Sequence, residues 1–378
     1  MSFVYEPVIE QIAASVAAHA AEVDRGAFPT ESLRALREAG LLGLVSAVDV
    51  GGKGLGLPAA AHVVERLARA CGSTAMVVCM HYCATAVIEQ LGPVDVRREI
   101  AAGRHLTTLA FSELGSRSQF WAPVSTATPD GEHVRLTARK SWVTSARHAD
   151  SYVWSSQPAA APGASTLWLV PRATAGLHVA DAPFDGLGLR GNDSSPITAE
   201  DARLPASARL GADGGGFEIM MNVVLPWFDV LTAAVSAGLM EAAVQSTAAH
   251  AAGTRFAHAG STIADLPTAR AYVARMRIAT DQVKTLLADT LAAITEGRPD
   301  TVLRVLEVKA AAGEAATQVT DLAMRVCGGA AYRKEVGVER VFRDARAATV
   351  MAPTTDVLYD FIGKAVCGLP LFGGARDE

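Results

Sequence analysis

Two short polar segments carry the residue types that can hold a flat, hydrogen-bonding ring. In the first, residues 109–118, an apolar strand pattern runs into a turn that contains Ser112, Glu113, Gly115 and Ser118. Backbone N–H groups and hydroxyls at such a turn can bond the carbonyls and ring nitrogens of a heterocycle. By itself the segment also fits a solvated turn between two strands.

The second segment, residues 140–146, places an aromatic plane beside a hydroxyl, because Thr144 follows Trp142 two positions later. A lone Trp is most often part of a core. Beside a hydroxyl it can also stack on a ring whose edge the hydroxyl binds. Together the two segments predict a site for a planar heterocyclic ligand.

The C-terminal part of the chain holds a second set of informative residues. Gly328 and Gly329 follow an apolar helical pattern and allow a backbone to approach another molecule closely. Residues 351–356 form a turn whose hydroxyls are placed to cap a final helix over 356–363. The alternating charges of residues 339–346 lie between these features and are typical of a structural ion-pair network.

These segments need elements to position them, and the hydrophobic spacing predicts three domains. Residues 1–104 show helical spacing, and residues 105–215 show short strand patterns with a hairpin signal at 129–131. Residues 216–378 return to long helical patterns. The sequence therefore predicts an α+β multidomain protein.

The order and spacing of these motifs resemble the acyl-CoA dehydrogenase family, a group of FAD-dependent enzymes. The family's ring-binding segments read Thr-Glu-Pro-Gly-Ala-Gly-Ser-Asp and Trp-Ile-Thr-Asn, and its Gly-x-Arg-Gly-Ser turn corresponds to residues 188–194. The resemblance extends approximately over residues 70–370. It implies a helical N-terminal domain, a middle β domain and a C-terminal four-helix bundle, with FAD between the β domain and the bundle.

The resemblance also implies roles for individual residues. The flavin and its phosphates would be lined by Phe111, Ser112, Gly115, Ser118, Trp142 and Thr144. Arg255 would bind the FAD diphosphate, and Arg325 would add a charge near the adenosine phosphates. The FAD of a neighbouring subunit in a homotetramer would be reached by Gly328, Gly329, Thr354 and Asp356. Leu, Arg and Gln at positions 114, 117 and 119 depart from the family's pattern and leave the substrate side of this loop open.

The family's catalytic base has no counterpart in this sequence. In the family, a Glu removes the proton α to a thioester carbonyl while the β hydride passes to the flavin. One family position for this Glu is the C-terminal turn, where Ala352 stands here. The other lies on the long helix after the β domain, one residue before an Arg, and these positions are Phe228 and Asp229 here. Neither Ala nor Phe accepts a proton.

Several explanations stay open. Asp229, about 100° around the helix from Phe228, is the candidate for a relocated catalytic base, with Glu113, His81 and Tyr82 as weaker candidates. Alternatively, the enzyme is a flavin-dependent monooxygenase, or it eliminates a leaving group from a thioester in a desulfinase-like reaction. A further alternative is an assembly subunit that keeps FAD for stability. The leading expectation is oxidation of an acyl thioester, on CoA or a carrier protein, with an electron-transfer flavoprotein or oxygen as acceptor.

Composition narrows the remaining classes of protein. A net charge of -5 over 378 residues, with scattered basic residues, gives no reason to expect nucleic acid binding. The apolar stretch 75–88 is too short and too interrupted to span a membrane, and residues 1–6 lack the pattern of a signal peptide. Five cysteines in apolar surroundings, without metal-site spacing, predict reduced, buried thiols and a cytoplasmic location.

Overall fold

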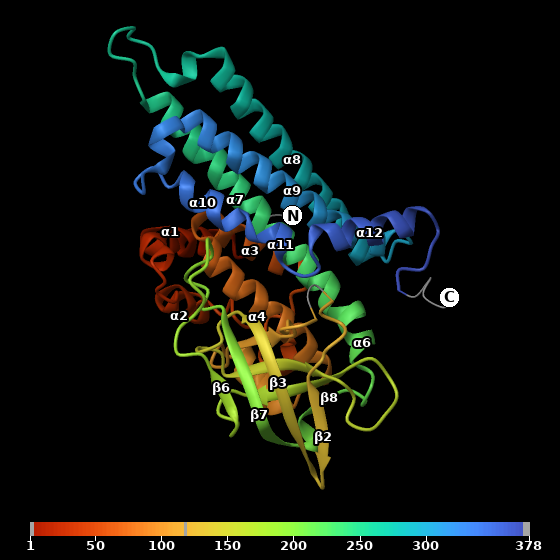
Figure 1. Ribbon diagram of the computed structural model, residues 1–378. Helices are drawn as coiled ribbons and strands as arrows, with labels where there is room; N and C mark the ends of the chain where they lie inside the picture. The colour runs from red at the N-terminus through yellow and green to blue at the C-terminus, as the bar shows by residue number, and fades with distance from the viewer. Residues whose placement is uncertain (1–3, 117–118, 373–378) are drawn as a thin grey trace.

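The computed structural model describes residues 4–116 and 119–372, and its chain begins with helices (Figure 1). Their bounds are α1 (Glu6–Asp24), α2 (Thr30–Glu38), α3 (Leu57–Ala70), α4 (Gly72–Leu91) and α5 (Val94–Ala101). Helix α2 follows Pro29, and α3 has Pro58 in its first turn. Proline suits a helix start because its φ is already helical and its missing N–H would have no intrahelical partner there.

The middle of the chain folds into two packed sheets. Its strands are β1 (Thr107–Ala110), β2 (Thr126–Asp130), β3 (His133–Val143), β4 (Ser151–Ser156), β5 (Thr166–Pro171), β6 (Leu177–Val179), β7 (Ser195–Pro205) and β8 (Arg209–Leu210). One four-stranded sheet has the order β1-β4-β5-β8 and the other the order β2-β3-β7-β6. Trp154, Trp168 and Leu136 belong to the core that the sheets share, which explains the alternating burial along β3.

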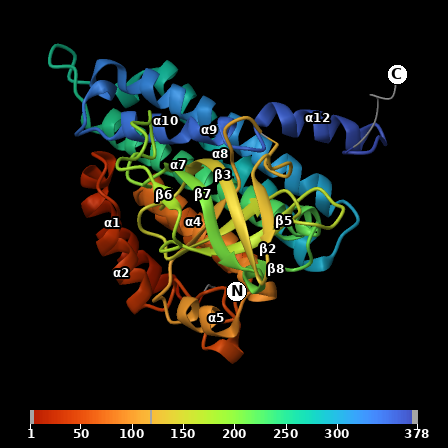
Figure 2. The same ribbon diagram turned by 60° about the horizontal axis from the view of Figure 1, so that its bottom comes forward.

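Long helices form the rest of the described chain. They are α6 (Gly216–Ile219), the π-helical segment η3 (Met220–Val224), α7 (Leu225–Gly253), α8 (Pro267–Glu296), α9 (Thr301–Cys327), α10 (Val338–Ala345), α11 (Ala347–Val350) and α12 (Thr355–Val366). Helix α7 packs against α8, α9, α3 and α4, while α10 and α12 pack against α9. Figure 1 shows the C-terminal helices at one end of the molecule and the sheets at the other, with α4 between them, and Figure 2 shows α9, α10 and α12 crossing above the sheets.

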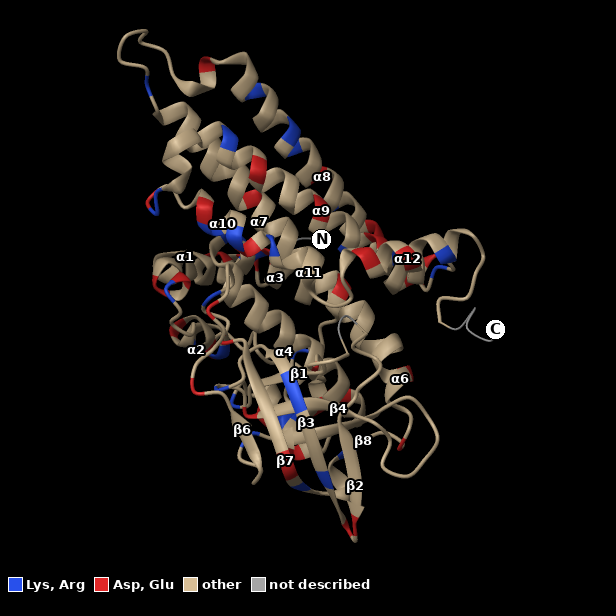
Figure 3. Ribbon diagram, in the orientation of Figure 1, with Lys and Arg blue, Asp and Glu red and all other residues tan. Residues whose placement is uncertain are grey.

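Helices α4 and α7 form the centre of the molecule. By length and composition, Gly72–Leu91 and Gly216–Gly253 could each cross a membrane, but 78% of each apolar window is buried inside the protein. Both are therefore core helices that join the N-terminal helices, the sheets and the bundle. Charged residues of both signs are interspersed over the outer helices and strands, and α7 is almost free of them (Figure 3).

The predicted order of helices, strands and helices is confirmed, and so is the hairpin, in which Asp130 of β2 pairs with His133 of β3. Two expectations are wrong. Cys367 is exposed because it lies just after the end of α12, beyond that helix's packed face. Helix α12 begins at Thr355 and continues to Val366, and no side chain caps its first turn.

Candidate active site

A cavity of about 630 Å³ lies where the β unit, α4 and the C-terminal helices meet. Met76 and Met80 of α4 line it, together with residues from the segments 109–115, 184–194 and 347–354. Most of its lining side chains are apolar or aromatic. The site is thus built at a junction of domains, where binding pockets commonly occur.

Half of the residues that the sequence assigned to a flavin site line this cavity. They are Phe111, Ser112, Gly115, Trp142, Thr144 and Thr354. Asp356 instead lines a neighbouring hollow beside α12. Ser118 lies outside the residues that the structure describes. Arg255, Arg325, Gly328 and Gly329 line neither of these two hollows.

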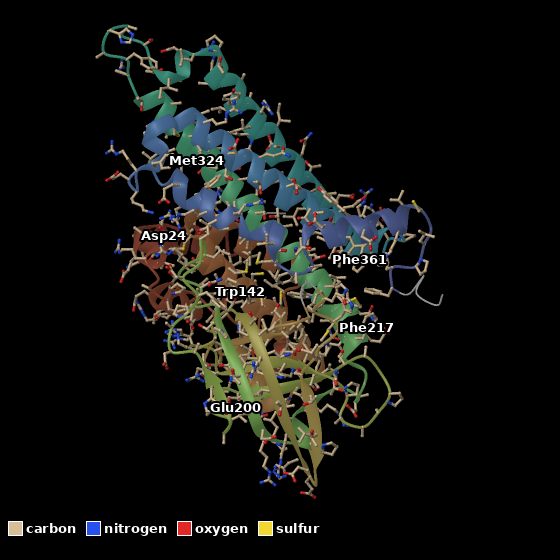
Figure 4. The ribbon with its side chains drawn as sticks, in the orientation of Figure 1. Asp24, Trp142, Glu200, Phe217, Met324 and Phe361 are labelled. Carbon is tan, nitrogen blue, oxygen red and sulfur yellow. The ribbon has the colours of Figure 1, made fainter. Side chains whose placement is uncertain are left out.

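Trp142 reaches the cavity because strand β3 is irregular at this point. The pairing of β3 with β7 shifts register between Lys140 and Val143, and Trp142 has a φ of 55°. A bulge of this kind re-aims a side chain away from the regular pleat. The indole is 59% exposed, and its ring centre lies 4.1 Å from that of Phe184. Figure 4 shows Trp142 at the end of the sheets that faces the helices.

Glu113 also lines the cavity, but it is tied into a buried ion pair. Its carboxylate pairs with Lys140 Nζ and accepts backbone N–H groups from Val124 at 2.6 Å and Ser125 at 2.9 Å. Burial alone would raise the pKa of Glu113, but Lys140 and Ser125 hold it below its usual value. Lys140 Nζ donates a further bond to the Ser155 carbonyl at 2.7 Å. Glu113 is therefore a structural carboxylate rather than a free base.

Asp229 lies directly behind the cavity wall. It is fully buried on α7, next to Phe228, which does line the cavity. Neither of its carboxyl oxygens has a hydrogen-bond partner within the described part of the chain. Burial raises the pKa of Asp229 far above its usual value, although the ammonium group of Lys309 opposes this shift. A carboxyl of this kind can exchange a proton near neutral pH.

The weaker base candidates serve the N-terminal domain instead. The His81 ring contacts the Leu42 carbonyl at 3.1 Å and accepts the N–H of Thr107, and the Tyr82 hydroxyl donates to the Leu41 carbonyl. Burial lowers the pKa of His81 to about 4 and raises that of Tyr82. Neither residue lines the cavity.

Among the described residues that line the cavity, the charged side chains are Glu113 and Arg190. Arg190 lies 3.6 Å from Asp185 near the surface. The remaining polar lining consists of hydroxyls, one amide and backbone groups. The described wall thus presents no free carboxylate or imidazole to a bound ligand.

The residues present fit a flavin. An exposed indole beside an apolar hollow suits a flat aromatic ring, and the Thr144 and Ser112 hydroxyls can bond its edge. Gly115 has a φ of 106° and open space where a Cβ would be, so a ligand can approach its backbone.

The hollow beside α12 is less suited to a diphosphate. It is lined by Asp356, Asp360 and Lys364, and Lys364 is paired with Asp360 at 2.7 Å. Within the described residues, no unpaired cation lines this hollow. Arg325 stacks on Tyr272 at 4.6 Å, and its neighbour Met324 lies in the bundle, far from Trp142 in Figure 4.

Sequence reasoning missed two lysines of this site, Lys140 and Lys309. A lysine between the apolar residues Val308 and Ala310 signals a buried cation that needs partners. The partners of Lys309 are carbonyls of the turn 351–353, which the sequence pattern does not reveal. Lys140 follows an arginine in an ordinary strand pattern and gives no such signal.

Known proteins are similar to this chain in sequence and in fold along nearly its whole length. The families described as acyl-CoA dehydrogenase N-terminal, middle and C-terminal domains match residues 4–103, 108–202 and 214–367. The short-chain specific acyl-CoA dehydrogenase of Bos taurus is 29% identical and covers 89% of this chain and 83% of its own length. An L-prolyl-[peptidyl-carrier protein] dehydrogenase of Pseudomonas fluorescens is 27% identical and covers 86% of this chain and 87% of its own length.

A solved glutaryl-coenzyme A dehydrogenase in complex with glutaryl-CoA has the same fold, with a TM-score of 0.91. It is 23% identical and covers 100% of this chain and 99% of its own. Because matches to all three family domains follow one another in order along this sequence, the chain belongs to the acyl-CoA dehydrogenase family and is a FAD-dependent oxidoreductase.

Proposed function

We propose that this flavoprotein oxidises the CH–CH bond beside the carbonyl of an acyl thioester, with Asp229 as the proton acceptor. The observation that carries the proposal is the position of the cavity. It joins the two flavin-binding segments to the turn at Ala352 and to a buried carboxyl behind Phe228. Relatives named for CoA thioesters and for a carrier-protein thioester support both forms of the substrate.

The turn at Ala352 supplies a donor for the thioester carbonyl. The Met351 carbonyl points to Lys309 Nζ, 3.0 Å away, and Lys309 does not line the cavity. In a planar trans peptide the following N–H points the opposite way, so the Ala352 N–H is directed at the cavity. This N–H has no partner among the described residues. A thioester carbonyl bonded there becomes polarised, and its α proton becomes more acidic.

The acyl chain would lie against the apolar walls, where Met76, Met80 and Phe228 exclude water. FAD, when bound, supplies the acceptor for the β hydride. Asp229 takes the α proton in its ionised form once the ring of Phe228 turns aside. A raised pKa suits this role, because a base with a pKa close to the working pH combines availability with proton affinity.

A reaction without a base is the second candidate, and a specific observation favours it. The described cavity wall carries no free carboxylate or imidazole. A flavin-dependent monooxygenase or a desulfinase-like elimination needs no α-proton acceptor at Ala352. Oxygen consumption would then indicate the monooxygenase, and reduction of an electron-transfer flavoprotein would indicate the dehydrogenase, whereas the elimination is redox-neutral and uses neither acceptor.

We also propose a cytoplasmic homotetramer in which each FAD is completed by a neighbour. The hollow beside α12 is lined by carboxylates and a paired lysine, so a diphosphate there needs a cation from outside. Arg255 and Arg325 of another subunit are the proposed source. The five cysteines are all unpaired, which suits a reducing compartment.

The variant Ala352→Glu tests the proposed pose. If a thioester binds with its carbonyl at the Ala352 N–H, the new carboxylate reaches its α carbon. In an Asp229→Asn background, which lacks the proposed base, flavin reduction by a fitting acyl-CoA under anaerobic conditions should then rise by ~10²–10⁴-fold. The double change Ala352→Glu with Pro353→Gly relaxes the stiff turn and controls for a misdirected side chain. If no acyl thioester reduces the flavin of either variant, the proposed pose is wrong.

A further inference from the structure

The bundle side of the cavity is held from behind by a lysine that does not itself line it. Lys309 is buried on α9, and its Nζ donates to the carbonyls of Met351 at 3.0 Å and Pro353 at 2.5 Å. These carbonyls flank Ala352, which does line the cavity. One ammonium group therefore spans the turn on the side opposite to the ligand.

We propose that Lys309 is a positioning residue, which fixes the turn 351–353 so that the Ala352 N–H points at the thioester carbonyl. The inference rests on the proposed function for the identity of the ligand. It adds a residue that acts through the turn and contacts neither substrate nor cofactor.

The physical reason is that two bonds from one point fix two peptide planes. Hydrogen bonds from a charged donor are roughly twice as strong as neutral ones. Each peptide is planar, so fixing the Met351 carbonyl also fixes the direction of the Ala352 N–H. Pro353 has no N–H, so the donors that the clamp directs are the Ala352 N–H and, beyond the Pro353 carbonyl, the N–H of Thr354, which also lines the cavity.

The surroundings of Lys309 show why the clamp does not depend on a direct ion pair. Its Nζ lies 5.8 Å from the ring centre of Phe228. Asp229 acts on Lys309 electrostatically without a hydrogen bond to it. The thiol of Cys83 on α4 also interacts electrostatically with Asp229. Burial lowers the pKa of Lys309 and Asp229 raises it. Asp229→Asn therefore leaves an amine that still donates to the turn whether charged or neutral, whereas Lys309→Met removes both bonds.

The experiment compares two ligands that differ by one carbonyl. S-phenylacetyl-pantetheine is a thioester without a β C–H bond, so it cannot be oxidised, and its thioether analogue lacks the carbonyl. Pantetheine is the arm that CoA and carrier proteins share, so the probe covers both sources. Binding to the FAD-loaded protein is followed by the change in the flavin absorption spectrum.

Wild type and Asp229→Asn should prefer the thioester by about five- to tenfold, the size of one hydrogen bond. Lys309→Met should lose the preference while its affinity for the thioether stays the same. If Lys309→Met folds poorly, the double variant Asp229→Asn with Lys309→Met removes the unbalanced carboxyl and should show the same loss. Lys284→Met is the control. It removes a half-exposed lysine of α8 that pairs with Glu65 of α3 at 3.0 Å, and it should keep the preference for the thioester.

A Lys309→Met protein that keeps the thioester preference would overturn the inference. If neither ligand perturbs the flavin of wild type, the proposed substrate class fails instead. Hydrogen exchange then decides the inference separately. The Leu358 N–H, which donates to the Thr354 carbonyl at 2.9 Å, should exchange faster in Lys309→Met than in wild type and Lys284→Met. Equal exchange in all three proteins would overturn the positioning role whatever the ligand.

Discussion

Single buried carboxyls in this protein differ in their partners, and the partners decide their chemistry. Glu113 is held ionised by Lys140 and backbone N–H groups. Asp229 has a neighbouring cation but no hydrogen bond within the described chain. Asp344, in α10, lies between these extremes, because it accepts the Leu189 N–H at 2.6 Å and has no ion-pair partner among the described residues.

Asp344→Asn should stabilise the protein at neutral pH. Burial raises the pKa of Asp344 from 3.8 to about 6. A carboxyl with a raised folded-state pKa gives its full stability below the unfolded pKa and loses it as pH rises through the folded pKa. The unfolding free energy of wild type should therefore fall by about 2–3 kcal/mol between pH 4 and 7, whereas that of Asp344→Asn should not show this fall, because the amide does not ionise. Chemical denaturation at both pH values measures the difference in unfolding free energy.

Asp213→Asn is the control of opposite sign. Burial would raise the pKa of Asp213, but Thr166 and the N–H groups of residues 159–161 hold it well below its usual value. The stability that ionised Asp213 gives to the folded protein is present at neutral pH and is lost as pH falls and the carboxylate is protonated. The amide should thus destabilise the protein at pH 7. A benefit of Asp344→Asn that is equal at pH 4 and 7 would contradict the burial argument.

At the scale of elements, the two flavin-binding segments are joined by the Glu113–Lys140 pair. Lys140→Met leaves Glu113 buried and unpaired, which should cost about 3–5 kcal/mol and lower FAD content. The double variant Glu113→Gln with Lys140→Met should recover part of the stability. Arg135, on the same strand as Lys140, forms an exposed pair with Asp130 of β2, and Arg135→Met should cost less than about 1 kcal/mol. Equal losses for Lys140→Met and Arg135→Met, measured by thermal unfolding and flavin content, would refute this role.

The sequence was sufficient for the order of elements, and six of the twelve residues that it assigned to the flavin site line the cavity. Trp142 and Thr144 could be predicted because they are two positions apart in one short segment, at the end of β3 and just after it, whose local sequence resembles the family's motif. Phe184 was not, since its contact with Trp142 depends on a loop after another strand. The partners of Lys309 lie 42 and 44 residues away, and only the packing of α9 against the final turn brings them together. Local periodicity carries no information about such contacts.

At the scale of the whole molecule, substitutions of Gly329 test whether this glycine is needed for a contact within the chain or for a contact between subunits. A Cβ at this glycine would meet no atom within 4 Å in the described chain. Gly329→Val should therefore leave the single chain's fold intact but weaken FAD retention in the proposed oligomer, and Gly329→Ala should do so less. Light scattering with flavin content measures both properties. A monomer that holds FAD tightly, with or without the change, would contradict the shared site.

The most direct test of the account is anaerobic mixing of the FAD-loaded protein with a panel of acyl thioesters on CoA and on carrier protein. The account predicts that a fitting thioester bleaches the flavin. The rate should rise with pH across the neutral range, because burial raises the pKa of Asp229 and only the ionised carboxylate accepts a proton. Asp229→Asn should slow the bleaching by ~10²-fold or more while FAD stays bound. Full retention of flavin colour with every thioester, in a protein that holds FAD, would contradict the account.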